Sequence, residues 1–154
     1  MADEIKIIEV GPRDGLQNES INIDTQVKVE FIESLIKAGH KNIEITSFVR
    51  SEKIPQLKDA TEVCNAIVSK NPDVNFWALV PNMIGLEHAL KCGVKKIAVF
   101  SAVSETFNKK NINSSIEESL EKIQLVCKKA QEHNLEIRGY ISTAFGCPYE
   151  GKFE

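Results

Sequence analysis

The sequence predicts an α/β fold, which we interpret as a (β/α)8 TIM barrel of which this chain holds only about the first five strands and four helices. Short apolar segments alternate strictly with segments of helical spacing, as in parallel sheets with right-handed crossovers. A doubly wound sheet accepts the same number of strands, but its GxGxxG pattern does not follow the first strand. Unusual polar residues follow the expected strands at their carboxyl ends, where such barrels carry their chemistry.

The first unit consists of a strand over 5–10, IKIIEV, and a helix over about 24–38. Asp24 or Thr25 is expected to cap this helix, and Gly39 to end it. Its predicted inward face consists of Val27, Phe31, Ile32, Leu35 and Ile36.

The second unit consists of a strand over 42–48, NIEITSF, and a helix over about 55–69. The turn Asn71-Pro72-Asp73 ends that helix. Its inward residues are expected to be Leu57, Ala60, Val63, Cys64 and Ile67.

The third strand is expected over 76–81, followed by a short helix that Asn82 can cap and Gly93 can end. The fourth strand spans 96–102, and a polar loop follows it.

The last predicted helix begins in SSIEES, where Ser114 and Glu117 or Ser115 and Glu118 have the spacing of a capping box. Its inward stripe is Ile116, Leu120, Ile123, Cys127 and Ala130. The fifth strand spans 135–143. A complete barrel takes about 250 residues, so the 154 residues correspond to the first half and a little more, and we place no internal domain boundary in 1–154.

Composition argues against several classes of protein. The net charge is −3 and no basic stretch exceeds a pair of lysines, which is not the pattern of a nucleic-acid-binding surface. The amino terminus resembles neither a signal nor a transit peptide, and no apolar run approaches the roughly 18 residues of a membrane span. The four cysteines form no CxxC pair. We therefore expect a soluble protein of the reducing cytoplasm.

Arg13 and Asp14 directly follow the first strand, between Gly11 and Gly15. Arginine can hold a carboxylate or a developing oxyanion with a forked set of donors, and aspartate can bind a hard divalent cation. Together they suit a reaction that forms an enolate. The alternative is an ordinary ion pair at the base of a loop.

Glu44 lies between two isoleucines in an otherwise apolar strand. If Ile43 and Ile45 face the helices, Glu44 faces the barrel interior, where a carboxylate must be paired or must coordinate something. Arg138 alternates in the same way in the fifth strand and is a possible structural partner. The alternative is an outward, solvated Glu44.

Other reactive side chains give weaker signals. The histidines are expected away from the catalytic mouth, so a nucleophilic triad has no support; they are His40, His88 and His133. Cys147 is the one thiol predicted beyond a strand's carboxyl end, with burial in a turn as its alternative. Lys109 and Lys110, ahead of Asn111, could meet a phosphate, with a solvated charge pair as their alternative.

Four segments in order strongly resemble the amino-terminal half of the 3-hydroxy-3-methylglutaryl-CoA lyase family: VGPRDGLQNE, IEITSFV, KKNINSSIEES and RGYISTAFGCPYEGK. The resemblance implies a (β/α)8 enzyme that cleaves hydroxymethylglutaryl-CoA to acetyl-CoA and acetoacetate with Mg²⁺ or Mn²⁺. It implies Arg13 as the catalytic oxyanion partner and Asp14 as a metal ligand. Glu44 would be the second catalytic residue, orienting the metal-site water and the Asp14 and Arg13 side chains.

The resemblance also implies substrate contacts. Gln17 would contact the substrate or support the site, and Tyr140 would approach the acyl group. Lys110 and Asn111 are weaker candidates for the CoA tail.

The family's remaining metal ligands and its thiol acid have no counterpart in these residues. They are a HxH pair on the seventh strand, an asparagine on a later loop and a cysteine on a glycine-rich lid. Cys147 also precedes Pro-Tyr, but it follows the fifth strand and matches a different position. We therefore expect the chain to be inactive alone and to associate with itself or with the missing half barrel. The alternatives are a non-catalytic half-barrel module and a related synthase of the isopropylmalate or homocitrate type.

Overall fold

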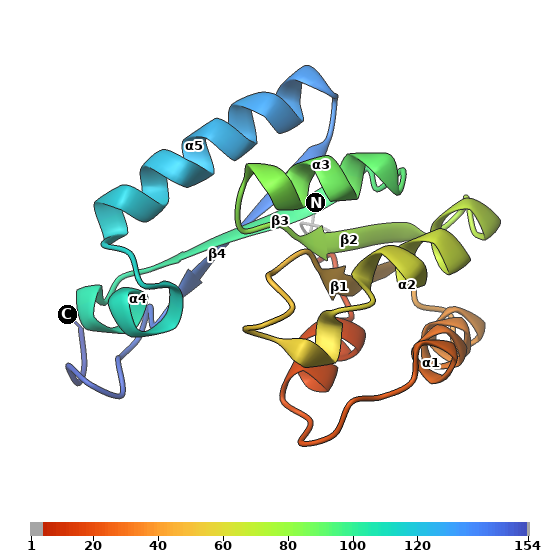
Figure 1. Cartoon of the computed structure of the whole chain (residues 1–154), viewed down its shortest axis with the longest axis horizontal. Helices are drawn as coiled ribbons and strands as arrows, with labels where there is room; N and C mark the ends of the chain where they lie inside the picture. The colour runs from red at the N-terminus through yellow and green to blue at the C-terminus, as the bar shows by residue number, and fades with distance from the viewer. Residues whose placement is uncertain (1–4, 154) are drawn as a thin grey trace.

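The computed structural model describes residues 5–153 and contains one parallel sheet of four strands in the order β1-β2-β3-β4 (Figure 1). The strands are β1 (Asn42–Ser47), β2 (Asn75–Leu79), β3 (Lys96–Ala102) and β4 (Glu136–Ser142). Each strand pairs in parallel with the next one along the chain. A doubly wound sheet would reverse its strand order, so the sequential order is that of barrel staves.

Helices provide the crossovers between the strands (Figure 1). The α-helices are α1 (Thr25–Lys37), α2 (Ala60–Ile67), α3 (Met83–Lys91), α4 (Glu105–Ile112) and α5 (Ile116–Glu132). Shorter turns are η1 (Gly11–Gly15), η2 (Pro55–Leu57) and η3 (Val68–Lys70). Several predicted helix ends are confirmed: Asp24 caps α1, Asn82 caps α3, and Ser115 with Glu118 forms a capping box on α5.

The apolar core lies between one face of the sheet and the helices. From the strands it takes alternate residues, namely Ile43, Ile45, Phe76, Ala78, Val80, Ile97, Val99 and Ile137. Every residue that was predicted to point inward from the second helix is buried. The residues of opposite parity, including Glu44, Trp77 and Arg138, lie on the other face of the sheet, which is the interior of the barrel.

The sheet is strongly curved. In a flat sheet β1 and β4 would lie about 14 Å apart, because neighbouring strands are about 4.8 Å apart. Arg138 and Tyr140 of β4 nevertheless bond to Glu44 of β1. Lys6, ahead of β1, also reaches Glu136 of β4 at 3.1 Å. The chain is therefore part of an α/β barrel, with these side chains meeting on its concave side.

The predicted first strand is much shorter than expected. Only Glu9 pairs with β1, through a parallel bridge to Ile43, with Glu9 N donating to Asn42 O at 2.9 Å and Glu44 N to Glu9 O at 2.8 Å. Ile5 and Ile7 are mostly exposed. Among residues 5–153 this segment has a strand neighbour on one side only. The alternation of apolar residues over 5–10 was therefore not sufficient to form a ladder of β-sheet hydrogen bonds. The five-strand count was wrong, and the described sheet has four strands.

The predicted polar loop after β3 forms α4, which raises the number of α-helices among the described residues from the predicted four to five. Ser104 caps it by accepting from Phe107 N at 2.9 Å. The Asn108 amide is buried and donates to the carbonyls of Ser114 and Ser115. The prediction of helices relied on a stripe of apolar residues at helical spacing. In α4, polar side chains that bond to the backbone take the place of that stripe.

Two predicted helix faces are partly confirmed. Ile32, Leu35 and Ile36 of α1 are buried or pack against the core, as do Ile123, Cys127 and Ala130 of α5. In α1, Val29 and Ile32 are buried while Val27 and Phe31 are exposed. In α5, Val126 is buried and Leu120 is exposed. Among residues 5–153, no helix is both long and apolar enough to cross a membrane.

Candidate active site

Arg13 and Asp14 lie in η1, a turn with π-helical hydrogen bonding that begins two residues after the Glu9 bridge. Their backbone N–H groups both donate to Val10 O, at 3.1 and 2.7 Å. The Glu9 carboxylate accepts from Gly11 N at 2.6 Å. A Cβ at Gly11 would lie 2.8 Å from that carboxylate oxygen, so a larger residue there would displace the Glu9 carboxylate from its hydrogen bond. Single π-helical turns often occur at functional sites.

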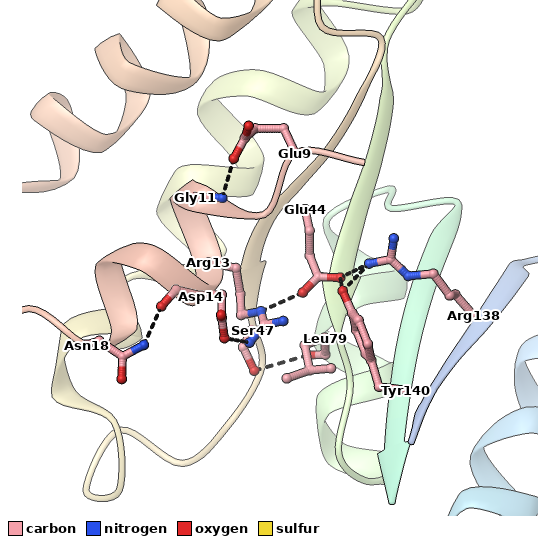
Figure 2. Close-up of polar contacts among 10 residues, drawn as sticks. All are labelled: Glu9, Gly11, Arg13, Asp14, Asn18, Glu44, Ser47, Leu79, Arg138 and Tyr140. Carbon is pink, nitrogen blue, oxygen red and sulfur yellow. Dashed lines mark hydrogen bonds and ion pairs between the residues drawn. The ribbon is translucent and has the colours of Figure 1, made fainter. Parts of the chain in front are cut away.

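Glu44 lies at the centre of a polar cluster inside the barrel (Figure 2). It is 0% exposed. Its Oε1 accepts from Arg13 Nε at 2.5 Å, and its Oε2 accepts from the Arg138 guanidinium and from the Tyr140 hydroxyl at 2.9 Å. The structure thus confirms that Glu44 faces inward and that Arg138 is its partner. Both carboxylate oxygens are engaged, so Glu44 acts on its neighbours by holding them in place.

Arg13 connects the buried carboxylate to the exposed one. Its Nη1 donates to Asp14 Oδ1 at 2.5 Å, and its Cζ lies 5.7 Å from the Tyr140 ring centroid. The Arg13 side chain is nearly buried, whereas that of Asp14 is 53% exposed. Among residues 5–153 no group accepts from Arg13 Nη2. Nη2 is therefore the terminal nitrogen of Arg13 that has no partner among these residues.

The charges in the cluster balance. Two carboxylates, Glu44 and Asp14, face two guanidiniums, Arg13 and Arg138. Burial works to lower the pKa of Arg13, but the charges of Glu44 and Asp14 and the hydrogen bond to Glu44 outweigh it and raise that pKa. Burial and the neighbouring Glu44 raise the pKa of Tyr140. Arg13 is thus held charged and Tyr140 protonated, and the guanidinium is a fixed cation.

The described residues do not form a complete divalent metal site. No group of three His, Cys, Asp or Glu side chains converges anywhere within residues 5–153. Asp14 is exposed, and one of its oxygens accepts from Arg13. Octahedral Mg²⁺ or Mn²⁺ needs several oxygen or nitrogen ligands. Asp14 is the one carboxylate in η1, and it could contribute a single ligand.

The remaining predicted substrate residues lie outside this cluster. Gln17 is half-buried just after η1, with no hydrogen bond from its side chain to the Glu44 cluster. Lys110 and Asn111 are exposed on α4, which corrects the expectation that they lie in a loop. Lys110 Nζ lies 3.8 Å from the Tyr149 ring centroid. Their roles stay predictions.

Cys147 is buried in the turn after β4, as its alternative interpretation expected. Its Sγ lies 3.0 Å from Ser104 Oγ, and Tyr149 N donates to it at 3.4 Å. Burial works to raise the pKa of Cys147, but its hydrogen bond with Ser104 and those from backbone N–H groups outweigh burial and lower that pKa. The Glu150 carboxylate accepts from Thr106 N at 2.9 Å. This turn is thus fastened to the start of α4.

Sequence reasoning missed Trp77 and the bond between Tyr140 and Glu44. The role of Tyr140 as a substrate contact stays a prediction, and in the structure its hydroxyl bonds to Glu44. Trp77, opposite Glu44 in the sheet register, lies under Arg138, whose Cζ is 4.9 Å from the ring centroid. The signal was present, because residues 138 and 140 must share one face of a strand. The contact across two intervening strands depends on the curvature of the sheet, which no local pattern gives.

The chain is similar to known proteins along almost its whole length. A sequence model of the family described as HMGL-like matches residues 4–154. The cytoplasmic 3-hydroxy-3-methylglutaryl-CoA lyase of Rattus norvegicus is 50% identical over 151 residues, which cover 98% of this chain and 44% of that protein. The mitochondrial hydroxymethylglutaryl-CoA lyase of Homo sapiens is 51% identical over 148 residues, which cover 96% and 45%.

Solved structures agree with these similarities. The hydroxymethylglutaryl-CoA lyase of Pseudomonas aeruginosa superposes with a TM-score of 0.90 at 46% identity, covering 96% of this chain and 49% of that one. An HMG-CoA lyase of Acinetobacter baumannii, in complex with coenzyme A and 3-methylmalate, superposes at 0.89 with 32% identity, covering 96% and 48%. The chain spans less than half the length of these relatives.

Proposed function

Because the chain belongs to the HMGL-like family, we propose that it provides the amino-terminal part of a carbon–carbon lyase site that cleaves 3-hydroxy-3-methylglutaryl-CoA to acetyl-CoA and acetoacetate. The observation that carries this proposal is the Arg13 guanidinium, fixed on a fully buried Glu44, with Nη2 as the terminal nitrogen that has no partner among residues 5–153. The names of the relatives support the choice of substrate.

Arg13 would act on the charge that the reaction creates. When the C3 hydroxyl loses its proton to a base and the C2–C3 bond breaks, C3 becomes the ketone carbon of acetoacetate. The electron pair of that bond passes to an enolate of the acetyl thioester, with negative charge on the thioester oxygen. A cation that is already held in place stabilises this charge without having to reorganise. The raised pKa of Arg13 keeps it charged throughout the working range of pH.

Glu44, Arg138 and Tyr140 would hold Arg13 in that position. Glu44 bonds to Arg13 Nε on one oxygen and to Arg138 and Tyr140 on the other. The Tyr140 ring also lies beside the Arg13 guanidinium. Tyr140 and Gln17 are proposed to border the acyl group, and Lys110 and Asn111 the CoA tail. The coenzyme A bound to the Acinetobacter relative supports a CoA thioester as the ligand class.

Asp14 is proposed as one ligand of Mg²⁺ or Mn²⁺. A bound divalent ion would polarise substrate oxygens as a Lewis acid. The described residues supply one such carboxylate and no three-ligand group, so we derive no step of the reaction through the ion.

The free edge of β4 is proposed to take part in assembly. Within the described residues β4 pairs only with β3, and Ile141 on it is exposed. An unpaired strand edge is a template for another strand. We propose that this edge binds the remaining part of a barrel or a second copy, which size-exclusion chromatography would test. A cytoplasmic location stays a prediction, because the relatives include proteins named cytoplasmic and mitochondrial.

The proposal can be tested by fusing residues 1–154 to the remaining half of the Pseudomonas aeruginosa lyase and measuring acetyl-CoA release from hydroxymethylglutaryl-CoA. In the active fusion, Arg13→Ala should lower turnover by about 10²–10³. Lys37→Ala removes an exposed cation at the far end of α1 and should leave turnover unchanged. Near-normal turnover of Arg13→Ala would refute the assigned role. Condensation with a 2-oxo acid instead of cleavage would indicate the synthase alternative.

A further inference from the structure

A buried ion pair lies outside the Glu44 cluster, between α1 and the start of α2. Lys28 of α1 is 4% exposed, and its Nζ donates to Asp59 Oδ1 at 2.6 Å. Thr25, three residues earlier on the same helix, donates from Oγ1 to Asp59 Oδ2 at 2.7 Å. Both carboxylate oxygens of Asp59 are therefore held by the beginning of α1.

The same lysine also bonds to the loop that follows β1. Lys28 Nζ donates to Gln56 O at 2.6 Å, and Gln56 lies in η2, three residues before Asp59. A buried ammonium group needs acceptors, because burying it unpaired is costly. The loop over 48–59 is therefore fixed to α1 at two points, and it cannot move away without breaking a buried charge pair.

The side chain of Gln56 bonds to the segment that follows η1. Its Nε2 donates to Glu19 O at 2.8 Å. One residue before Glu19, Asn18 Nδ2 donates to Asp14 O at 2.8 Å (Figure 2). A continuous series of hydrogen bonds, joined by short pieces of backbone, thus leads from Lys28 to the backbone of η1. We call it the Lys28 series.

The Lys28 series lies at the end of the sheet where the proposed chemistry takes place. The loop over 48–59 follows the carboxyl end of β1, and η1 follows Glu9, which pairs in parallel with β1. Such barrels carry their active sites at the carboxyl ends of the strands. Glu44 holds the side chain of Arg13, whereas the bond from Asn18 holds the backbone of the same turn.

We propose that Lys28, Asp59 and Gln56 are positioning residues for the turn that carries Arg13 and Asp14. The buried pair fixes the loop after β1, and the Gln56 amide fixes the segment after η1 to that loop. This role rests on the proposed function in one respect, namely that the turn meets the substrate. The three residues act through η1 and need no contact with the substrate.

Asn71 provides a matched comparison for Gln56. Its Nδ2 donates to Ile67 O at 3.0 Å, in the turn before β2. The bond is of the same kind, from a side-chain amide to a backbone carbonyl, but it lies at the amino end of the sheet. If such bonds only stabilise the fold, the loss of either one should affect η1 equally. A positioning role predicts an effect on η1 for Gln56 alone.

The order of the turn can be measured without substrate. The backbone N–H groups of Arg13 and Asp14 both donate to Val10 O, and that of Asn18 donates to Gly15 O. Their hydrogen–deuterium exchange therefore reports how often the turn opens. Mass spectrometry of a peptide that contains residues 11–19 follows this exchange at pH 7.

The first test compares Gln56→Ala with Asn71→Ala in the chain of residues 1–154. In Gln56→Ala, exchange over 11–19 should be about two- to fivefold faster, which is the lower part of the range for one hydrogen bond, because this bond is exposed. Asn71→Ala should exchange over 11–19 as the parent does. Parent-like exchange in Gln56→Ala, or an equal increase in Asn71→Ala, would overturn the proposal.

A double variant tests the buried end of the series. If Lys28 and Gln56 act through the same loop, Lys28→Met combined with Gln56→Ala should exchange over 11–19 no faster than the faster single variant. Increases that multiply would show two independent effects and would contradict the series. If Lys28→Met does not fold, Thr25→Val takes its place, because it removes only one bond to Asp59.

The last test uses the active fusion. A misplacement of about 1 Å can cost about 10²-fold in rate, so the loss of one of several supports should lower kcat of Gln56→Ala by about three- to tenfold. KM should stay unchanged, because Arg13 is proposed to act on charge that forms in the transition state. Asn71→Ala should turn over as the parent does.

Unchanged kcat in the Gln56→Ala fusion would overturn the positioning role. An inactive parent fusion would count against the proposed function instead. The exchange rates over 11–19 would then still decide whether the Lys28 series holds η1, so failure here and failure of the proposed function are distinguishable.

Discussion

Two carboxylates face the interior of the partial barrel, and each lies between two cations. Glu44 lies between Arg13 and Arg138, and Glu136 between Lys6 and Lys96. The pattern of charge is the same, but Glu44 is 0% exposed and the Glu136 side chain is 45% exposed. Water therefore screens the charge of Glu136 much more than that of Glu44. Burial, rather than the number of ion pairs, therefore decides which of the two clusters holds its side chains in fixed positions.

The choice of cation follows the same division. Arginine presents a planar fork and serves the buried carboxylate, while lysine is a strongly hydrated point charge and serves the exposed one. Trp77 lies between the two clusters, with Arg138 Cζ 4.9 Å and Lys6 Nζ 5.3 Å from its ring centroid. The buried cluster can thus be rigid at the proposed site, while the exposed cluster lies at the amino ends of β3 and β4.

The largest effect should come from Glu44→Gln. The substitution keeps the shape of the side chain but leaves two guanidiniums without their buried counter-charge. Breaking a buried ion pair by removing one partner costs about 3–5 kcal/mol. The free energy of unfolding, measured by urea denaturation at pH 7, should fall by this amount. A loss similar to that of Glu136→Gln would show that burial does not separate the two clusters.

Tyr140→Phe should have an intermediate effect. It removes one hydrogen bond to Glu44 Oε2 and leaves the ring beside Arg13 and both ion pairs in place. A hydrogen bond to a charged group contributes about 1.5–3 kcal/mol, and the partial exposure of Tyr140 favours the lower end. Urea denaturation of the variant and the parent measures it. An unchanged urea midpoint of unfolding would mean that a water molecule replaces the Tyr140 hydroxyl as a donor to Glu44. Solvent would then reach the cluster more than the exposed fractions of its side chains indicate.

The buried cluster was only partly predictable from the sequence. The order Ile43-Glu44-Ile45 was sufficient to orient Glu44, because successive side chains of a strand point to opposite faces. The bond from Tyr140 to Glu44 joins residues 96 positions apart and depends on the curvature of the whole sheet. Sequence patterns describe single elements, and curvature is a property of their assembly.

The errors in the fold have the same origin. The segment over 5–10 has the alternation of a strand, but a strand also needs neighbours, and only Glu9 bridges to β1. Conversely, α4 has almost no apolar stripe, and polar bonds support it instead. Ser104 accepts from a backbone N–H at its start, and Asn108 donates to two carbonyls in the turn that follows it. The first element depends on a tertiary neighbour and the second on local bonds from side chain to backbone, and hydrophobic periodicity records neither.

The smallest effect should come from Glu136→Gln, and its pH dependence sharpens the comparison. The hydrogen bond from Lys96, with help from Lys6, lowers the pKa of Glu136. Because the pKa of Glu136 is lower in the folded than in the unfolded state, its ion pairs stabilise the fold at any pH above the unfolded pKa, which is near 4.3 for a carboxyl group. This stabilisation is lost as the pH falls through the pKa of the folded state. Because the group is half exposed, the difference at pH 7 should stay below about 1 kcal/mol. Urea denaturation at pH 7 and pH 3 should show that difference disappearing in acid, and 1 M salt, with a Debye length of about 3 Å, should shrink it at pH 7. If the difference in the free energy of unfolding persists at pH 3, it comes from packing of the Glu136 side chain. The charge of Glu136 would then not contribute, and the comparison with Glu44 would fail.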